Sequence, residues 1–186
     1  NSSCSAFVPV ALRPGDLVPL HYGDLEVLQL TSGLPRAYFS ACYRIVPDHA
    51  AALAAMAEPQ WDPRQETVVI GPGPGRSCKV PGRPLPVRID QYEPEQVSLI
   101  VQAPVSGFAV LLDAAYPGWE ASLDGQRVPI QTANYLYRAV WVPAGLHEIR
   151  FSYRPLSFRL GLASSAMGIA VLAGLAVRRR CERNKP

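Results

Sequence analysis

An uncharged stretch of 18 residues, 160–177, constrains this chain more than any other part of its sequence. As a helix it would be roughly 27 Å long, which is close to the thickness of the hydrocarbon core of a bilayer. Its only polar side chains are those of Ser164 and Ser165, which can hydrogen bond to their own helix. The sequence therefore predicts a single C-terminal transmembrane helix within 156–177. The alternative is a buried C-terminal helix followed by a basic tail.

Three arginines, Arg178, Arg179 and Arg180, follow this stretch directly. Basic residues beside a transmembrane helix stay on the cytoplasmic side of the membrane, so these arginines orient the chain. We expect residues 1–155 to lie outside the cytoplasm and the tail, 178–186, to lie inside it.

Small residues recur four positions apart within the predicted span. The pairs are Gly161 with Ser165, Ser164 with Gly168, and Ala170 with Gly174. Because small side chains let two helices approach closely, this spacing favours packing against other transmembrane helices.

The net charge of +3 is unevenly distributed along the chain. Five of the 18 basic residues and one of the 15 acidic residues lie in the tail, which leaves 13 basic and 14 acidic residues elsewhere. Such a balanced domain does not offer the basic face that nucleic acid requires, so nucleic acid is not an expected partner. The basic tail instead indicates contact with anionic membrane lipid.

Cysteine and histidine spacing gives no sign of a metal site, and no motif indicates a cofactor. Cys4, Cys42 and Cys78 lie in the predicted outer part, so at most one disulfide can form there. The sequence leaves open which two of the three form it.

Residues 25–155 are long enough for one domain with its own core. Before them, proline and glycine interrupt residues 1–24, which are predicted to be irregular. A short helix is expected over 49–57, with Asp48 as its cap. The segment 71–86, rich in glycine and proline, is predicted to be a surface loop or linker.

The region after residue 86 has the pattern of short strands. Apolar and polar residues alternate over 87–91 and 96–102, which is typical of a half-buried antiparallel pair. Six or seven short strands at this spacing predict a mainly β domain, an antiparallel, jelly-roll-like β-sandwich with one short α-helix.

Two hairpins are expected within this region. Asp124 and Gly125 separate two strand candidates, and this dipeptide favours a tight hairpin because both turn positions need positive φ. A second hairpin is predicted between strands 137–142 and 147–153, around a Pro-Ala-Gly turn.

Aromatic residues are the first candidates for ligand binding. Five in the strand-rich region are considered as candidates: Tyr116, Trp119, Tyr135, Tyr137 and Trp141. Their rings could stack on a sugar, or they could fill the sandwich core, where aromatic side chains bury large areas. Trp119 follows a Pro-Gly turn, which makes it the best surface candidate. Tyr153 and Phe158 adjoin the predicted span and suit a third role, anchoring at the membrane interface.

Polar residues in the same region add one candidate. Asn134 either sets a loop conformation or bonds a ligand, so it joins Tyr116, Trp119 and Tyr135 as a candidate ligand-binding residue. Asp113, Glu120 and Asp124 lie within twelve residues, and glycosyl chemistry uses paired acids. The turn explains Asp124, and the other two stand where solvated acids are common, so no catalytic residue is assigned.

Five short motifs follow one another in the second half of the chain: Tyr116-Pro-Gly-Trp119, Leu123-Asp-Gly125, Ala133-Asn-Tyr-Leu136, Val142-Pro-Ala-Gly145 and Tyr153-Arg-Pro155-Leu-Ser-Phe158. Two further segments precede them: Leu34-Pro-Arg-Ala-Tyr38 and Trp61-Asp-Pro63. In this order and spacing they resemble the C-terminal region of YfhO-type bacterial membrane proteins. The resemblance runs from about residue 25 to residue 177.

This resemblance implies a function. Family members look like GT-C-class glycosyltransferases, which move a sugar from a polyprenyl-phosphate carrier to an extracytoplasmic acceptor. It implies that the chain is the outer β-domain and last membrane helix of such a protein in the bacterial cytoplasmic (inner) membrane. The chain starts at Asn1 without a signal peptide, so we expect either a cleaved signal or further helices upstream, and we expect the catalytic part to be absent.

The implied partners are the other transmembrane helices of the parent protein and a glycan or polyprenyl-phosphate sugar. The competing interpretation is a non-enzymatic surface module with a single membrane anchor, which binds glycan or another envelope component.

Overall fold

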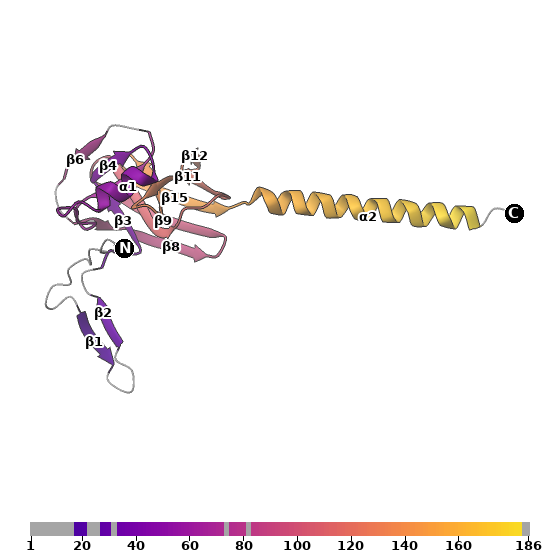
Figure 1. The fold of residues 1–186 in the computed structure, drawn as a ribbon, viewed down its shortest axis with the longest axis horizontal. Coiled ribbons are helices and arrows are strands. Elements are labelled where there is room, and N and C mark those ends of the chain that lie inside the picture. The colour runs from indigo at the N-terminus through magenta and orange to yellow at the C-terminus, as the bar shows by residue number, and fades with distance from the viewer. Residues whose placement is uncertain (1–16, 22–26, 31–32, 73–74, 81–82, 184–186) are drawn as a thin grey trace, which may run out of the picture.

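The computed structural model describes residues 17–21, 27–30, 33–72, 75–80 and 83–183, which form two β-sheets, a separate hairpin and two helices (Figure 1). The larger sheet contains, from edge to edge, β6 (Arg76–Cys78), β4 (Cys42–Val46), β5 (Thr67–Ile70), β13 (Gln131–Ala133), β14 (Tyr137–Val142), β10 (Gly107–Ala114), β3 (Ala37–Ser40) and β7 (Leu85–Pro86). The smaller sheet contains β12 (Gln126–Val128), β11 (Trp119–Leu123), β15 (Gly145–Tyr153), β9 (Gln96–Ala103) and β8 (Arg88–Glu93). The remaining elements are the hairpin of β1 (Leu17–His21) and β2 (Val27–Leu30), and the helices α1 (His49–Met56) and α2 (Leu156–Arg183).

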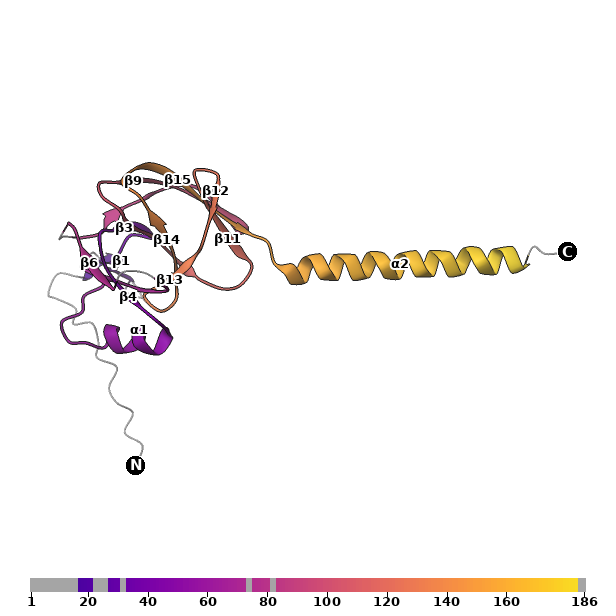
Figure 2. The ribbon, with the colours of Figure 1, turned by 90° about the horizontal axis from the view of Figure 1, so that it is seen from above.

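The two sheets face each other and enclose the main hydrophobic core, so the predicted β-sandwich is confirmed (Figure 2). The alternation of side chains along each strand explains this packing. In β9, Val97, Leu99 and Val101 are buried against the facing sheet, and in β15 Ile149 and Phe151 are buried in the same core. The antiparallel pairing of β8 with β9 also agrees with the prediction.

One strand pair departs from the antiparallel pattern. Strands β4 and β5 run parallel, with Tyr43 opposite Thr67 and Val46 opposite Ile70. Parallel neighbours need a crossover connection, and α1 lies in the connection between these two strands. The larger sheet is therefore mixed.

The predicted second hairpin is wrong. Strand β14 pairs with β10 and β13 in the larger sheet, whereas β15 pairs with β9 and β11 in the smaller one. The Pro-Ala-Gly segment thus carries the chain from one sheet to the other. The Asp124-Gly125 hairpin is confirmed, because β11 and β12 pair and both turn residues have positive φ, 50° and 81°.

Helix α1 begins as predicted, because the Asp48 Oδ1 atom accepts a hydrogen bond of 2.8 Å from the backbone N–H of Ala51. The helix buries Ala52 and Ala55 against Val46 and Val68. Leu53 of the same helix has a larger side chain than these alanines, and it is 51% exposed. Alanines on the inner face let the helix lie close to the larger sheet (Figure 2).

Two predicted segments contain more structure than the sequence indicated, and one of the possible disulfides is formed. Within 1–24, expected to be irregular, residues 17–21 form β1; residues 1–16 and 22–24 lie outside the described residues. Within the proline-rich loop 71–86, β6 and β7 form the two edges of the larger sheet, where proline is tolerated. A disulfide joins Cys42 of β4 to Cys78 of β6; Cys4 is not among the described residues.

Helix α2 follows β15 after two residues and projects away from the sandwich (Figure 1). Among the described residues it is the one helix long and apolar enough to cross a membrane, over Leu156–Gly174, with a mean hydropathy of 1.6. None of that segment is buried against the domain. The predicted membrane span therefore coincides with a helix that has no packing partner in the described part of the chain.

Candidate functional site

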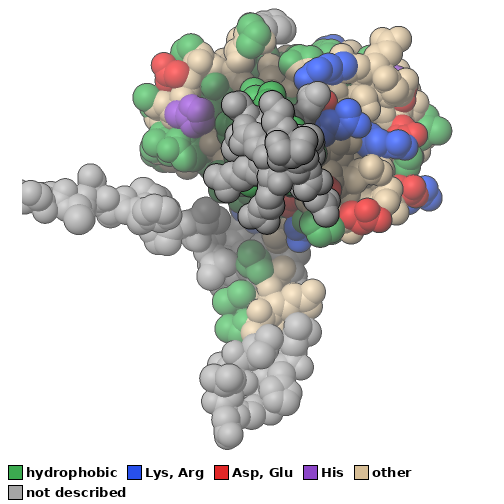
Figure 3. All heavy atoms as spheres, turned by 90° about the vertical axis from the view of Figure 1, so that its right-hand side faces the viewer, with side chains coloured by type: hydrophobic (Ala, Val, Ile, Leu, Met, Phe, Trp, Pro, Cys, Tyr) green, Lys and Arg blue, Asp and Glu red, His purple; other side chains and the backbone are tan. Residues whose placement is uncertain are grey.

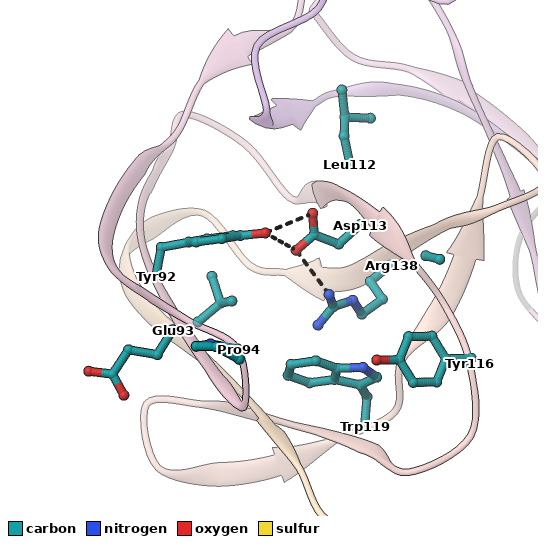
Figure 4. A pocket seen from close by; sticks show the side chains of 10 residues that line it. Tyr92, Glu93, Pro94, Leu112, Asp113, Tyr116, Trp119 and Arg138 are labelled. Carbon is teal, nitrogen blue, oxygen red and sulfur yellow. Dashed lines mark hydrogen bonds and ion pairs between the residues drawn. The ribbon is translucent and has the colours of Figure 1, made fainter.

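A cavity of about 360 Å³ opens at the end of the sandwich from which α2 starts. We call it the Arg138 cavity; its lining residues are Tyr92, Glu93, Pro94, Val97, Leu112, Asp113, Ala114, Tyr116, Trp119 and Arg138 (Figure 4). Trp119 lies opposite Tyr153, three residues before α2 begins. The backbone N–H of Tyr153 donates to Glu95 O (2.8 Å), and that of Arg154 donates to Gly118 O (2.6 Å). These hydrogen bonds connect two sides of the cavity to the last residues before the helix.

Arg138 is the central charged residue of the cavity. It lies on the inward face of β14, and its side chain is only 3% exposed. Its Nη2 atom lies 3.0 Å from Asp113 Oδ2, and its guanidinium carbon lies 3.8 Å from the centre of the Trp119 ring. The pKa of Arg138 is lowered from its usual value, mainly because burial disfavours the charged form.

Asp113, at the end of β10, is shared between two arginines. Its Oδ1 atom lies 2.9 Å from Nη2 of Arg36, and Tyr92 donates a hydrogen bond of 3.1 Å to Oδ2. Arg36 also bonds the Tyr92 hydroxyl. The Asp113 carboxylate raises the pKa of Arg36. The cluster of Arg36, Arg138 and Asp113 therefore carries one unbalanced positive charge.

Two aromatic rings that line the cavity, Tyr116 and Trp119, pack against the ring of Tyr153. The centroid of Tyr116 lies 6.2 Å from that of Trp119 and 5.5 Å from that of Tyr153, and the last two are 5.3 Å apart. Tyr116 is 48% exposed, whereas Trp119 is half-buried. Gly118 has φ +104°, and a Cβ there would lie 2.7 Å from the Tyr153 ring, so the turn between Tyr116 and Trp119 needs glycine.

A second cavity of about 250 Å³ lies beside the first. It shares Tyr116, Trp119 and Arg138 with the Arg138 cavity, and Ile130 and Thr132 help to line its other side. Tyr116, Trp119 and Arg138 therefore separate two hollows at the same end of the domain. Figure 3 looks at this end of the domain and shows Lys and Arg side chains beside Asp and Glu side chains on its surface.

The four predicted ligand-binding residues occupy three different environments. Tyr116 and Trp119 line the Arg138 cavity. Asn134 is buried, and it bonds the backbone N–H of Val68 (2.9 Å) and the hydroxyl of Tyr38 (3.1 Å). Tyr135 is 40% exposed and contacts the ring of His49 at 5.3 Å, away from the residues that line the cavity.

The acids that lie close in sequence have separate partners. Glu120 pairs with Arg127 at 2.8 Å, and Asp124 lies 2.6 Å from Nδ1 of His147. Asp113, as described above, holds two arginines. Across the described ranges, no group of three or more His, Cys, Asp or Glu residues could hold a metal ion.

Sequence reasoning missed the three residues that contact the Asp113 carboxylate: Arg36, Tyr92 and Arg138. One signal was present for Arg138. It lies two and four residues before Val140 and Val142, which are core residues of the same strand, so its side chain is expected on the inward face. A charged residue at such a position needs a buried partner. Nothing in the local sequence points to Arg36 or Tyr92, because each meets Asp113 across a long separation in the chain.

The three arginines predicted to orient the chain, Arg178, Arg179 and Arg180, lie in the last turns of α2. The structure describes only the backbone of these three residues, so the orientation of the chain in the membrane stays a prediction.

Comparison with known proteins connects this site to a family. Residues 86–165 match the family model described as the bacterial membrane protein YfhO. This match spans 80 of the 186 residues and includes every residue that lines the Arg138 cavity. Comparisons with curated proteins and with solved structures gave no match. The region that builds the cavity and the start of α2 therefore resembles the YfhO family of bacterial membrane proteins, as the sequence motifs predicted.

Proposed function

We propose that this chain is the extracytoplasmic accessory domain and last membrane helix of a larger YfhO-type protein that takes part in cell-envelope glycosylation. In this role the Arg138 cavity holds the polar group of a glycan acceptor or of a polyprenyl-phosphate sugar beside the membrane. The sugar transfer itself takes place in parts of the protein outside this chain. Residues 1–155 face away from the cytoplasm, and Arg178, Arg179 and Arg180 stay on the cytoplasmic side of the inner membrane.

The observation that carries the proposal is the place of the cavity. Trp119 and Tyr116 line it, and the strand that holds Trp119 is paired with the last residues before α2. With α2 in a bilayer, a ligand in the cavity therefore lies close to the lipid head groups. The disulfide between Cys42 and Cys78 supports an extracytoplasmic position, because disulfides persist in oxidising compartments.

The exposed surface of α2 supports packing against other membrane helices. Its apolar segment has no partner in the described part of the chain, and its small residues include Gly161, Gly168 and Gly174, at which an added Cβ would meet no other atom within 4 Å. Each of these glycines lies four residues from another small residue (Ser165, Ser164 and Ala170, respectively), a spacing that lets a second helix approach closely. Such a helix would come from the remainder of the parent protein.

Transfer of a labelled sugar from a polyprenyl-phosphate carrier, measured in membranes that contain the parent protein, tests the proposal. Trp119→Phe keeps an aromatic ring under Arg138 but shortens the cavity wall and removes the indole N–H. We expect a several-fold loss of transfer. The matched control is Trp141→Phe, which changes a partly exposed tryptophan that does not line this cavity.

Equal transfer by both tryptophan variants and the unchanged protein would refute a role of the cavity in glycosylation. A second candidate function, a singly anchored module that binds glycan without any transfer, is favoured by one observation: the described domain builds its cavity from its own residues. This alternative predicts that the Trp119→Phe change weakens glycan binding in membranes that show no transferase activity at all.

A further inference from the structure

We propose that Arg138 is the receptor for an oxyanion carried by a sugar, either a phosphate ester or a carboxylate. That the anion is attached to a sugar rests on the proposed function. The anion site itself rests on the contacts of Arg138.

Three buried donor nitrogens lie between the two cavities: Nε and Nη1 of Arg138 and Nε1 of Trp119. Within the described part of the chain, none of them has a hydrogen-bond partner. Buried N–H groups are almost always bonded, and these two side chains offer donors only. A group that satisfies them must therefore bring acceptors. Phosphate and carboxylate oxygens are the acceptors that a guanidinium binds most strongly.

The charge around Arg138 favours an anion over a neutral acceptor. Asp113 balances only one of the two arginines that it contacts, Arg36 and Arg138. The other acid that lines the cavity, Glu93, accepts a hydrogen bond of 2.8 Å from Gln91, and Figure 4 shows its carboxylate turned away from Arg138. Because the guanidinium is buried, an anion beside it would be attracted more strongly than one at an exposed arginine.

Trp119 holds the guanidinium in place. The ring lies against one face of Arg138 at 3.8 Å, while Asp113 fixes Nη2. This arrangement leaves the N–H groups of Nε and Nη1, on different sides of the guanidinium, in defined positions, so little ordering is needed when an anion binds. In Figure 4, a terminal nitrogen of Arg138 that is not bonded to Asp113 points toward Pro94, across the cavity.

Tyr116 controls access to the unbonded nitrogens of Arg138. It lines both cavities and is half exposed, and Figure 4 shows its hydroxyl turned toward Arg138 and Trp119. The unbonded nitrogens of Arg138 are closed to solvent. Rotation of the Tyr116 side chain would join the two hollows and open a path to them. The displaced ring could then contact the sugar that carries the anion.

Calorimetric titration of the purified full chain in detergent micelles, at constant ionic strength, tests the proposal directly. The probes are glucose 1-phosphate, glucuronate, inorganic phosphate and glucose. We expect at least one of the two charged sugars to bind 10-fold or more tightly than glucose. The tighter of these two identifies the phosphate ester or the carboxylate as the natural source of the anion. Binding of inorganic phosphate supports a site that recognises the anion itself.

Arg138→Gln should weaken binding of the charged sugar by about 10- to 100-fold, the loss of one or two hydrogen bonds to a charged group. The variant is expected to fold, because Asp113 keeps Arg36 and Tyr92 as partners. Arg138→Lys is the second variant: it retains the charge beside Asp113 but lacks the separate Nε and Nη1 donors, so it should lose binding as well. Arg150→Gln, which changes a half-exposed arginine paired with Glu148, is the control and should bind normally.

Several results would overturn the proposal: equal affinity for glucose and both charged sugars, no binding of any probe, wild-type affinity in both Arg138 variants, or an equal loss in Arg150→Gln. This experiment measures binding without sugar transfer, so its outcome is independent of the transferase assay. Loss of anion binding in Arg138→Gln together with unaltered transfer in Trp119→Phe would support the anion site and refute the glycosylation role.

Discussion

Replacement of Asn134 by alanine should destabilise the domain more than any change of an exposed polar residue. The side chain accepts a hydrogen bond from the buried N–H of Val68 and donates one to the hydroxyl of Tyr38, which is also buried. Burial raises the pKa of Tyr38 to about 12, so this hydroxyl stays protonated at neutral pH. The backbone of Asn134 has φ 45°, a conformation that asparagine adopts more readily than alanine.

These contacts set the expected size of the effect. Leaving the Val68 N–H buried without a partner costs about 1–3 kcal/mol, and the bond to Tyr38 adds about 1 kcal/mol. Alanine in the left-handed region adds about 1 kcal/mol more. We therefore expect Asn134→Ala to lower the free energy of unfolding by about 3–5 kcal/mol, a large part of the 5–15 kcal/mol that stabilises an ordinary domain.

Urea unfolding of the full chain in detergent micelles, followed by circular dichroism, measures this loss. Tyr38→Phe is the companion variant, because it keeps the buried ring and removes only the hydroxyl that Asn134 contacts. The double variant should be less destabilised than the sum of the two single changes, by about 0.5–1 kcal/mol, since both remove the same bond. A loss below 1 kcal/mol for Asn134→Ala, or strict additivity of the two changes, would refute this assignment.

Two further results follow from the described contacts. Reduction of the Cys42–Cys78 disulfide, or its replacement by serines, should lower the free energy of unfolding by about 3–4 kcal/mol, because the bond closes a loop with a sequence separation of 36; an unchanged urea midpoint under reducing conditions would contradict this. The hydrogen bonds from His147 and from the backbone N–H of Glu148 lower the pKa of Asp124. Its stabilising contribution is therefore present above the unfolded pKa of about 3.9 and is lost as the pH falls through the lower folded value. Asp124→Asn should flatten the fall in stability below about pH 4; an unaltered acid slope in this variant would rule out the contribution.

The sequence predicted those features of the fold that depend on neighbouring residues. The hairpin turn at Asp124 and Gly125 was predicted because both turn positions need positive φ. The helix cap at Asp48 was predicted because its side chain bonds the backbone N–H only three residues away, that of Ala51. The connection after β14 was misassigned because a Pro-Ala-Gly turn does not reveal which sheet the next strand enters. That choice is made by long-range pairing, in which β15 joins β9 and β11.

The candidate site was predicted only in part, for the same reason. Tyr116 and Trp119 stand out locally because a Pro-Gly turn places them beside each other. Arg138 gains its role from Asp113, Trp119 and Arg36, which come from three other segments of the chain. Asn134 and Tyr135 follow each other with positive φ, so their motif reflects a tight connection between β13 and β14. Sequence motifs alone do not distinguish such a backbone requirement from a ligand contact.

The short connection between β15 and α2 limits which molecules reach the cavity. Only Arg154 and Pro155 separate the last strand residue from the helix, and an extended dipeptide reaches about 7 Å. With α2 embedded in a bilayer, the domain stays at a nearly constant distance from the hydrocarbon core. This distance is comparable to the depth of one head-group layer. Molecules that diffuse laterally in the membrane therefore pass the cavity repeatedly, in a search confined to two dimensions. Molecules dissolved in the surrounding water meet it only by approaching from one side.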